Sequence, residues 1–362
     1  MNHSAGAAAL STRETPWIAN LRWDMTWMIG SAALVAVPVA AHFLLGVGAN
    51  GVDLLVTALI GGPHMYATFL RTVFEPKFRE RHRFLAWFPV VFVPTAVILA
   101  STFAFTALLS FFFMWASIHI CDQASYIAQQ YRLKSGGSAS ILERALDFAA
   151  ILSSLYVVAM YRFVDGTFVI SGYTVWFPEF LKVAWWPRLF AFGAAVVIST
   201  WAVRSINAYR AGRVGRPYLA FMLTTMVVSF LVPMMKELSV SFQGFNAWHS
   251  FQYLGLTFFA LNQRNGQGAV TSKFVKNLAG PRDFFRYYGW NVLLTVGAGV
   301  IVGILIWIIK LPQEQSYYTV VLSFLLVHYF HDHVLFSDSQ EPSLSTGRAA
   351  AGAASSSQAL AA

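Results

Sequence analysis

Three histidines and one aspartate stand within six residues near the end of the last long apolar stretch, VVLSFLLVHYFHDHVLFS (320–337). Imidazole nitrogens and carboxylate oxygens bind transition metals, and the same groups relay protons inside membrane proteins. Positions i, i+3 and i+4 share one face of a helix, so His328, His331 and Asp332 can point the same way. His333, five residues after His328, points elsewhere. The stretch is therefore a candidate wall of a metal or proton site.

Three more histidines lie inside apolar stretches: His64 in GGPHMYATF, His119 in ASIHICDQASY and His249 in NAWHSFQYLGL. An ionisable side chain within a membrane segment is costly, so each is a functional candidate. The GGP before His64 predicts a broken or kinked helix, which membrane proteins tolerate mainly where the backbone lines a buried site. Amide and carboxylate side chains follow the other two histidines and are candidates to coordinate a metal or to orient the imidazoles. These are Asp122, Gln123 and Gln252.

Nitrogen and oxygen donors without thiolates favour iron, in a mononuclear or dinuclear site, ahead of zinc, copper or manganese. The single cysteine, Cys121, excludes an internal disulfide and a Cys-rich zinc or iron–sulfur site. The sequence contains no nucleotide-binding loop, nucleophile elbow or zinc-protease motif, and it assigns no catalytic residue. The predicted metal ligands are His64, His119, His249, His328, His331 and Asp332.

A membrane scaffold must position these side chains. The chain is 57% hydrophobic and 11% charged, whereas soluble domains carry roughly 25% charged residues. Its mean hydropathy is +0.56, and long continuous apolar runs predict an all-α polytopic transmembrane helix bundle. We expect about ten spans, near 24–47, 52–71, 84–101, 103–130, 145–163, 181–203, 217–235, 238–262, 286–309 and 317–337.

The loops after the second, fourth, sixth and eighth predicted spans are basic, and the intervening loops are short or acidic to neutral. The positive-inside rule therefore places the basic loops and both termini in the cytoplasm. This topology accounts for the net charge of +9 without a nucleic-acid partner. Each candidate histidine stands on an even-numbered span, in its middle or cytoplasmic half. Four helices should thus deliver imidazoles at a similar depth near the cytoplasmic face.

We expect one polytopic domain over residues 23–337, after a cytoplasmic N-terminal segment (1–22) that lacks the pattern of a signal peptide. An Ala/Ser-rich tail (338–362) is predicted to be disordered. The expected location is the lipid bilayer of a bacterial inner membrane. The basic loops could also dock a cytoplasmic electron-transfer partner, although the topology already accounts for their charge.

The stretches HICDQ, WHSFQ and HYFHDH, together with His64, resemble the histidine-rich integral-membrane non-haem iron enzymes. These include fatty-acid desaturases and hydroxylases, alkane hydroxylases and bacterial membrane carotene-cleaving dioxygenases. The H-x-x-x-H and H-x-x-H-H boxes of desaturases are absent, and His328-x-x-His331 is the nearest approach to them. The plan is therefore more similar to that of the carotene dioxygenases. The resemblance implies O₂-dependent oxidation of an apolar, lipid-soluble small molecule.

Two other functions are compatible with the same residues. A proton-coupled transporter would use the buried His and Asp side chains as a relay near the membrane midplane. A haem b protein would place two axial histidines, such as His119 and His249, on two helices. The sequence leaves the substrate, the electron donor and the oligomeric state open.

Overall fold

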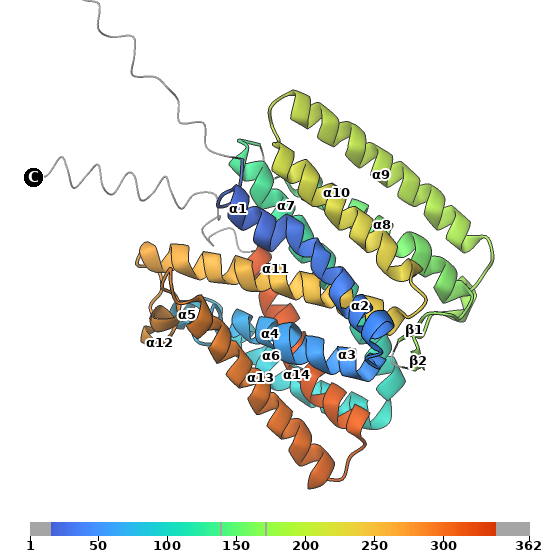
Figure 1. Cartoon of the computed structure of the whole chain (residues 1–362), viewed down its shortest axis with the longest axis vertical. Coiled ribbons are helices and arrows are strands. Elements are labelled where there is room, and N and C mark those ends of the chain that lie inside the picture. Colours follow the sequence, from blue (N-terminus) through green and yellow to red (C-terminus); the bar gives the residue numbers. More distant parts are fainter. Residues whose placement is uncertain (1–15, 138–139, 171, 338–362) are drawn as a thin grey trace, which may run out of the picture.

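The computed structural model describes residues 16–137, 140–170 and 172–337. The predicted Ala/Ser-rich tail and most of the predicted N-terminal segment lie outside the described residues. Nearly all of the described chain is helical, and the helices pack side by side into one bundle (Figure 1). The all-α class predicted from the sequence is confirmed.

The first predicted span is a continuous helical segment that changes its hydrogen-bonding pattern along its length. It consists of α1 (Leu21–Asp24), the π-helix η1 (Met25–Ile29), the 3₁₀ helix η2 (Gly30–Val35) and α2 (Ala36–Leu45). The second predicted span is α3 (Ala49–Val56), the π-helix η3 (Thr57–Gly61) and α4 (Gly62–Phe69). After these come α5 (Pro76–Arg81), α6 (Arg83–Phe103), α7 (Phe105–Lys134) and α8 (Ile141–Val164).

A short hairpin of β1 (Val169–Ile170) and β2 (Tyr173–Thr174) follows α8. The Tyr173 hydroxyl donates to Glu314 Oε2 (2.7 Å), which ties the hairpin to the start of the last helix. The remaining elements are η4 (Glu179–Leu181), α9 (Trp186–Arg210), α10 (Arg216–Leu231), η5 (Val232–Met234), α11 (Leu238–Gly266), α12 (Lys273–Leu278), α13 (Phe284–Trp307) and α14 (Gln313–Ser337).

All ten predicted stretches fall on helices. Among the described residues, seven helical segments are long and apolar enough to cross a membrane. These are Leu21–Leu45, Arg83–Phe103, Phe105–Lys134, Trp186–Arg210, Arg216–Met234, Phe284–Trp307 and Gln313–Ser337. The other three predicted stretches correspond to α3–η3–α4, α8 and α11, which carry more polar residues. The count of ten spans and the cytoplasmic termini remain predictions.

The GGP sequence does not end the second predicted span. The helix widens into the π-helix η3 and continues as α4, with Pro63 in its first turn. Proline has no N–H for the carbonyl four residues earlier, that of Leu59, and the Tyr288 hydroxyl donates to this carbonyl instead (2.5 Å). The expected irregularity is therefore a single π turn, a form common at functional sites.

Helix α11 lies very close to the first span because it carries glycines at the contacts. A Cβ atom on Gly255 would lie 2.5 Å from the ring of Trp27, and one on Gly244 would lie 2.5 Å from the Val35 carbonyl oxygen. Small residues that let helix backbones approach closely are characteristic of membrane helix packing. These contacts fix α11 near the centre of the bundle.

A buried polar network holds α7, α8, α9 and α10 together. The Arg132 guanidinium donates two hydrogen bonds to the two carboxylate oxygens of Asp147, each 3.0 Å long. The same carboxylate accepts from Tyr218 OH (2.6 Å) and from Trp201 Nε1 (3.1 Å). Such a bidentate pair with further donors satisfies a buried charge and fixes the relative position of the helices.

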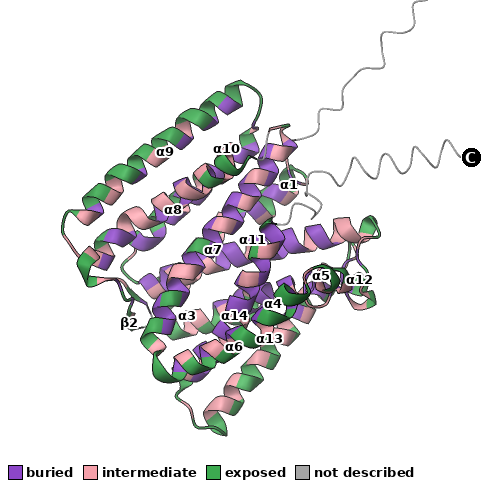
Figure 2. Cartoon of the chain, turned by 180° about the vertical axis from the view of Figure 1, so that it is seen from behind, coloured by how far each residue is buried: buried purple, intermediate pink, exposed green. Residues whose placement is uncertain are grey.

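Burial divides the helices into a centre and a periphery. The outward faces of α6, α9 and α13 are largely exposed, whereas α7, α11 and α14 contain long buried stretches (Figure 2). In the lower half of the bundle α4, α11, α13 and α14 pack against one another, and α14 also contacts α6 and α7. The helices that carry the candidate histidines are thus the central ones.

Candidate metal centre

Four helices of the described chain bring four histidines together. His64 comes from α4, His119 from α7, His249 from α11 and His328 from α14, and each side chain is at most 4% exposed. The ring centroid of His328 lies 4.6 Å from that of His64 and 4.9 Å from that of His119. The His249 centroid lies 5.3 Å from that of His64 and 5.1 Å from that of His119. The imidazoles therefore form a closed four-membered ring of neighbours.

The Nε2 atoms of these four histidines are buried and make no hydrogen bond to any part of the chain that the structure describes. The same is true of Oδ2 of Asp332. Buried polar atoms are nearly always paired, so each unpaired atom calls for an explanation. A metal ion is one group that could accept the lone pairs of such a cluster of atoms.

Hydrogen bonds at Nδ1 select the tautomer needed for coordination. A carbonyl oxygen can only accept, so His64 Nδ1 donates its proton to Gly61 O (2.6 Å). Gly61 is the last residue of the π turn and the N-cap of α4. A histidine that holds its proton on Nδ1 keeps the Nε2 lone pair free for a metal.

His328 shows the same arrangement through a hydroxyl group. Thr68 Oγ1 donates its one proton to Asp332 Oδ1 (2.8 Å), so it accepts from His328 Nδ1 (2.5 Å). Tyr253 OH also donates to Asp332 Oδ1 (2.5 Å). Two donors on one carboxylate oxygen orient Asp332 with Oδ2 turned toward the histidines. This oxygen lies 3.9 Å from His119 Nε2 and 3.6 Å from His328 Nδ1.

Each of the four histidines is followed, one helical turn later, by a polar side chain that supports the centre. Residues four apart share a helix face, and the hydroxyls that follow His64 and His249 (Thr68 and Tyr253) both donate to the carboxylate that follows His328 (Asp332). Gln123, four residues after His119, donates from Nε2 to the backbone carbonyl of His249 (3.2 Å). The four polar residues at these positions are Thr68, Gln123, Tyr253 and Asp332.

Two overlapping groups of donors within the described residues are compact enough to hold a metal ion. One consists of His64, His119 and His249, and the other of His119, His328 and Asp332. Within each group the donor atoms lie within 4.8 Å of one another. Three or four imidazoles with a carboxylate are typical ligands for non-haem iron and for zinc, copper or manganese. The residues present therefore fit a transition-metal ion.

The structure does not bring the other predicted residues into this cluster. His331 donates from Nε2 to Leu85 O (3.2 Å), its Nδ1 lies 3.3 Å from Thr72 Oγ1, and it belongs to neither donor group. Asp122 pairs with Arg144 (2.7 Å) and lies 3.6 Å from His333, whose side chain is 76% exposed. Gln252 donates to Met28 O (2.6 Å). Gln123 supports His249 through its backbone, as described above.

Thr68, Ser250 and Tyr253 also contact the histidines or Asp332, and they were not among the site residues predicted from the sequence. The Thr68 hydroxyl contacts His328, Asp332 and Tyr253. Ser250 Oγ lies 3.0 Å from His64 Nδ1. A polar residue four positions after a buried histidine was the available signal for Thr68 and Tyr253.

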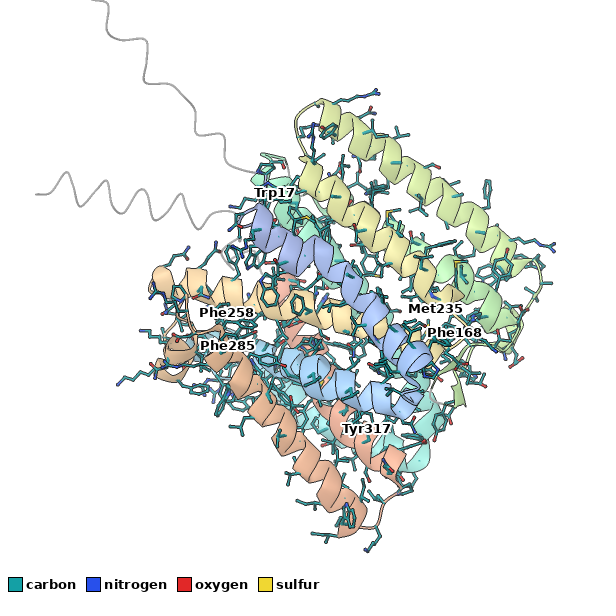
Figure 3. All side chains as sticks on the ribbon, in the orientation of Figure 1. Trp17, Phe168, Met235, Phe258, Phe285 and Tyr317 are labelled. Atoms are coloured by element: carbon teal, nitrogen blue, oxygen red, sulfur yellow. The ribbon has the colours of Figure 1, made fainter. Side chains whose placement is uncertain are left out.

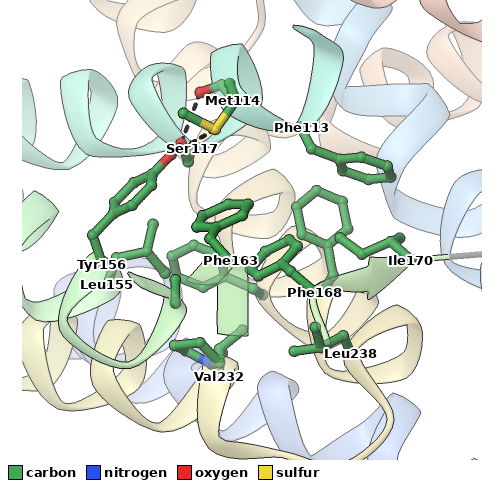
Figure 4. A pocket seen from close by; sticks show the side chains of 14 residues that line it. Phe113, Met114, Ser117, Leu155, Tyr156, Phe163, Phe168, Ile170, Val232 and Leu238 are labelled. Atoms are coloured by element: carbon green, nitrogen blue, oxygen red, sulfur yellow. Dashed lines mark hydrogen bonds between the residues drawn. The ribbon is translucent and has the colours of Figure 1, made fainter. Parts of the chain in front are cut away.

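Two cavities lie in this part of the bundle, and one of them reaches a histidine. One is bordered by His249 and by Tyr329, whose ring stacks on His119 at 4.0 Å. A second is lined almost entirely by apolar side chains, including Phe113, Phe163 and Leu238 (Figure 4). Each has a volume of about 50 Å³, and one water needs roughly 10–15 Å³ by this measure. A larger ligand would therefore need side chains to move.

The chain was compared with known proteins in three ways. No family model matches it, and neither the curated proteins nor the solved structures contain a significant match. The candidate site therefore stands on its own geometry, and these comparisons give no family for this chain.

Proposed function

We propose that this protein is an integral-membrane metalloenzyme that uses non-haem iron and O₂ to oxidise an apolar, lipid-soluble substrate. The observation that carries the proposal is the pair of overlapping donor groups, His64–His119–His249 and His119–His328–Asp332, whose four Nε2 atoms and Asp332 Oδ2 are buried and unpaired among the described residues. Iron held by nitrogen and oxygen ligands with an open position activates O₂. The resemblance to membrane non-haem iron enzymes supports the same chemistry.

The protein's own side chains would hold the metal and shape the reaction space. His64, His119, His249 and His328 would bind it through Nε2, and Asp332 would bind it or hydrogen-bond to its ligands. Thr68 and Tyr253 hold the carboxylate in place. Buried apolar and aromatic walls would exclude bulk water, which protects a reactive site from side reactions.

A membrane location supports this proposal and is part of it. Figure 1 places α5 and α12 at one end of the bundle, and the hairpin and the α2–α3 turn at the other. The basic loops lie at the first end, which we propose faces the cytoplasm of a bacterial inner membrane. A bilayer would solvate the exposed apolar faces of α6, α9 and α13 and deliver the substrate laterally.

A proton-coupled transporter is the second candidate, because buried His and Asp groups also serve as relays. Two overlapping three-donor groups that share His119 favour a bound ion over a chain of relays across the membrane. The bis-His haem arrangement is favoured less. The centroids of His119 and His249 are 5.1 Å apart, with two further imidazoles beside them, which leaves little room for a macrocycle.

The test uses full-length protein purified in mild detergent and loaded with ferrous iron without oxygen. We expect no Soret band, a bound Fe(II) that forms a paramagnetic nitric oxide complex, and O₂ consumption when an apolar membrane lipid extract is added. A control with His328→Ala should lose the bound iron, the nitric oxide complex and the O₂ consumption. Iron that binds without reacting with nitric oxide or O₂ would indicate a structural ion and contradict the enzyme proposal. Protein that stays metal-free would contradict the metal site itself.

A further inference from the structure

The cavity bordered by His249 reaches from the candidate metal centre toward the end of the bundle that holds the α2–α3 turn, which we call the outer end. His249 and Tyr329 border it at the centre, and Ala49, the first residue of α3, borders it at the outer end. Figure 3 shows Tyr317, another bordering residue, near the start of α14 at this same end. The polar side chains along the cavity include Asp53, Thr57, Gln243 and Asn246.

Four hydrogen bonds connect Asp53 to His64 by way of α11. His64 Nδ1 lies 3.0 Å from Ser250 Oγ, which donates to Asn246 Oδ1 (3.1 Å). Asn246 Nδ2 donates to Gln243 Oε1 (3.2 Å), and Gln243 Nε2 donates to Asp53 Oδ1. Counted from Asp53, the first three residues of this chain are partly exposed and the last two are buried. The chain therefore runs from a partly exposed carboxylate to a predicted metal ligand.

The cavity beside this chain suits water. Amide side chains fix such a chain in place but take up no proton near neutral pH, so protons would move through water next to them. The cavity has a volume of about 50 Å³, and one water needs roughly 10–15 Å³ by this measure, which leaves room for about three waters. Its polar walls supply the hydrogen-bond partners that buried water requires. The cavity of Figure 4 has the same volume but almost entirely apolar walls, so we expect it to stay dry.

His249 gives a second reason to place water in this cavity. Its side chain is 3% exposed, and its Nδ1 makes no hydrogen bond to any part of the chain that the structure describes. A histidine that binds a metal through Nε2 almost always donates its Nδ1 proton to a carboxylate, a carbonyl or a water. His64 and His328 have acceptors in Gly61 and Thr68. A water in the cavity would supply the acceptor for His249.

Asp53 is the group at the outer end that can exchange protons. Among the described residues that border the cavity it carries the only carboxyl group, and no lysine or arginine is present there. The other titratable side chains along the cavity are His249 and three tyrosines. Tyrosine hydroxyls ionise only at high pH, which leaves Asp53 to release and take up protons on this side.

We propose that this cavity is a hydrated inlet through which water and protons reach the metal centre, and that Asp53 exchanges these protons with the outer side of the membrane. A histidine must lose any proton on Nε2 before it binds a metal, and a buried centre needs a path by which that proton leaves. The role of the inlet at the metal rests on the proposed function, whereas exchange of histidine protons with solvent can be measured by itself.

The experiment measures how fast the Nδ1 protons of individual histidines exchange with D₂O. The full chain, labelled with nitrogen-15 in its histidine side chains, is studied by NMR in lipid nanodiscs, both metal-free and loaded with Zn(II). We expect the Nδ1 proton of His249 to exchange about tenfold faster than that of His328, which is bonded to Thr68 and does not border the cavity.

The Asp53→Asn variant tests the carboxylate. The new amide can still accept from Gln243 but exchanges no proton with the outside, so exchange at His249 should slow by about tenfold. Asp165→Asn is the matched control, because Asp165 is an exposed carboxylate at the end of α8 that does not border the cavity. The control should leave the exchange at His249 unchanged.

Equal exchange at His249 and His328 in the wild-type protein would overturn the inlet without any variant. No slowing in Asp53→Asn, or equal slowing in Asp165→Asn, would overturn the assignment of Asp53. Fast exchange at His249 in a protein that binds no Zn(II) would leave the inlet intact and refute the metal centre. Bound Zn(II) with exchange at His249 as slow as at His328 would leave the centre intact and refute the inlet.

Discussion

Replacing Thr68 with valine probes the arrangement around the metal centre without touching a predicted ligand. The two side chains have nearly the same shape, so Thr68→Val removes only the hydroxyl. That hydroxyl is fully buried and contacts His328 Nδ1 at 2.5 Å, Asp332 Oδ1 at 2.8 Å and Tyr253 OH at 2.6 Å. The variant therefore leaves His328 Nδ1 without its acceptor and Asp332 with one donor fewer.

The size of the effect follows from these contacts. Leaving a buried donor unsatisfied costs about 1–3 kcal/mol, and loss of a residue that orients a metal-binding histidine typically weakens metal affinity by about 10–100-fold. Since tenfold corresponds to about 1.4 kcal/mol, the two estimates agree. We therefore expect the metal dissociation constant of Thr68→Val to rise by about 10–100-fold.

The assay is an equilibrium competition between the purified protein and a chelator of known affinity. Thr225→Val is the matched control, because Thr225 is also buried and its hydroxyl donates to a backbone carbonyl on α10 (2.8 Å), a helix that carries none of the four histidines. The control should keep the wild-type metal affinity. If Thr68→Val and Thr225→Val bind the metal equally well, the proposed role of the hydroxyl is refuted.

Three further substitutions test particular contacts. His331→Leu should retain the metal and lower the melting temperature, because His331 bonds to Leu85 O and lies outside the donor groups; loss of metal would contradict this placement. Asp122→Asn should leave metal content unchanged and cost about 0.2–1 kcal/mol, since its pair with Arg144 is partly exposed; metal analysis and thermal unfolding check both points. Gly255→Ala should destabilise the protein by about 1–3 kcal/mol, because the new Cβ would meet the Trp27 ring; an unchanged melting temperature would refute the close contact.

The sequence was sufficient for the helices because hydropathy and helix ends are local properties. All ten apolar stretches fall on helices, and α7 continues past the predicted end at residue 130 to Lys134. It also identified four histidines and Asp332 as a group. The residues lie far apart in the sequence, so their spacing does not link them. The basic loops predicted the direction of each span, and from this we expected the histidines to lie at a similar depth.

The orientation of neighbouring side chains was harder to predict. Successive helical residues are rotated by about 100°, so the positions three and four residues after a histidine lie on either side of it, and the sequence does not show which of them turns toward the site. In α14 the fourth position, Asp332, joins the centre, whereas the third, His331, faces α6. In α7 the third position, Asp122, pairs with Arg144 of α8 instead. Which position turns inward depends on where the neighbouring helices lie, and that is a tertiary property.

The central claim is that His64, His119, His249 and His328 bind a transition-metal ion, and elemental analysis tests it most directly. Protein expressed with iron in the medium and purified without chelators should contain about one or two metal ions per chain. His119→Ala and His328→Ala should lose most of this metal, whereas His331→Leu, three residues from His328, should keep it. A folded wild-type protein without stoichiometric metal, or equal metal content in His328→Ala and His331→Leu, would contradict the account.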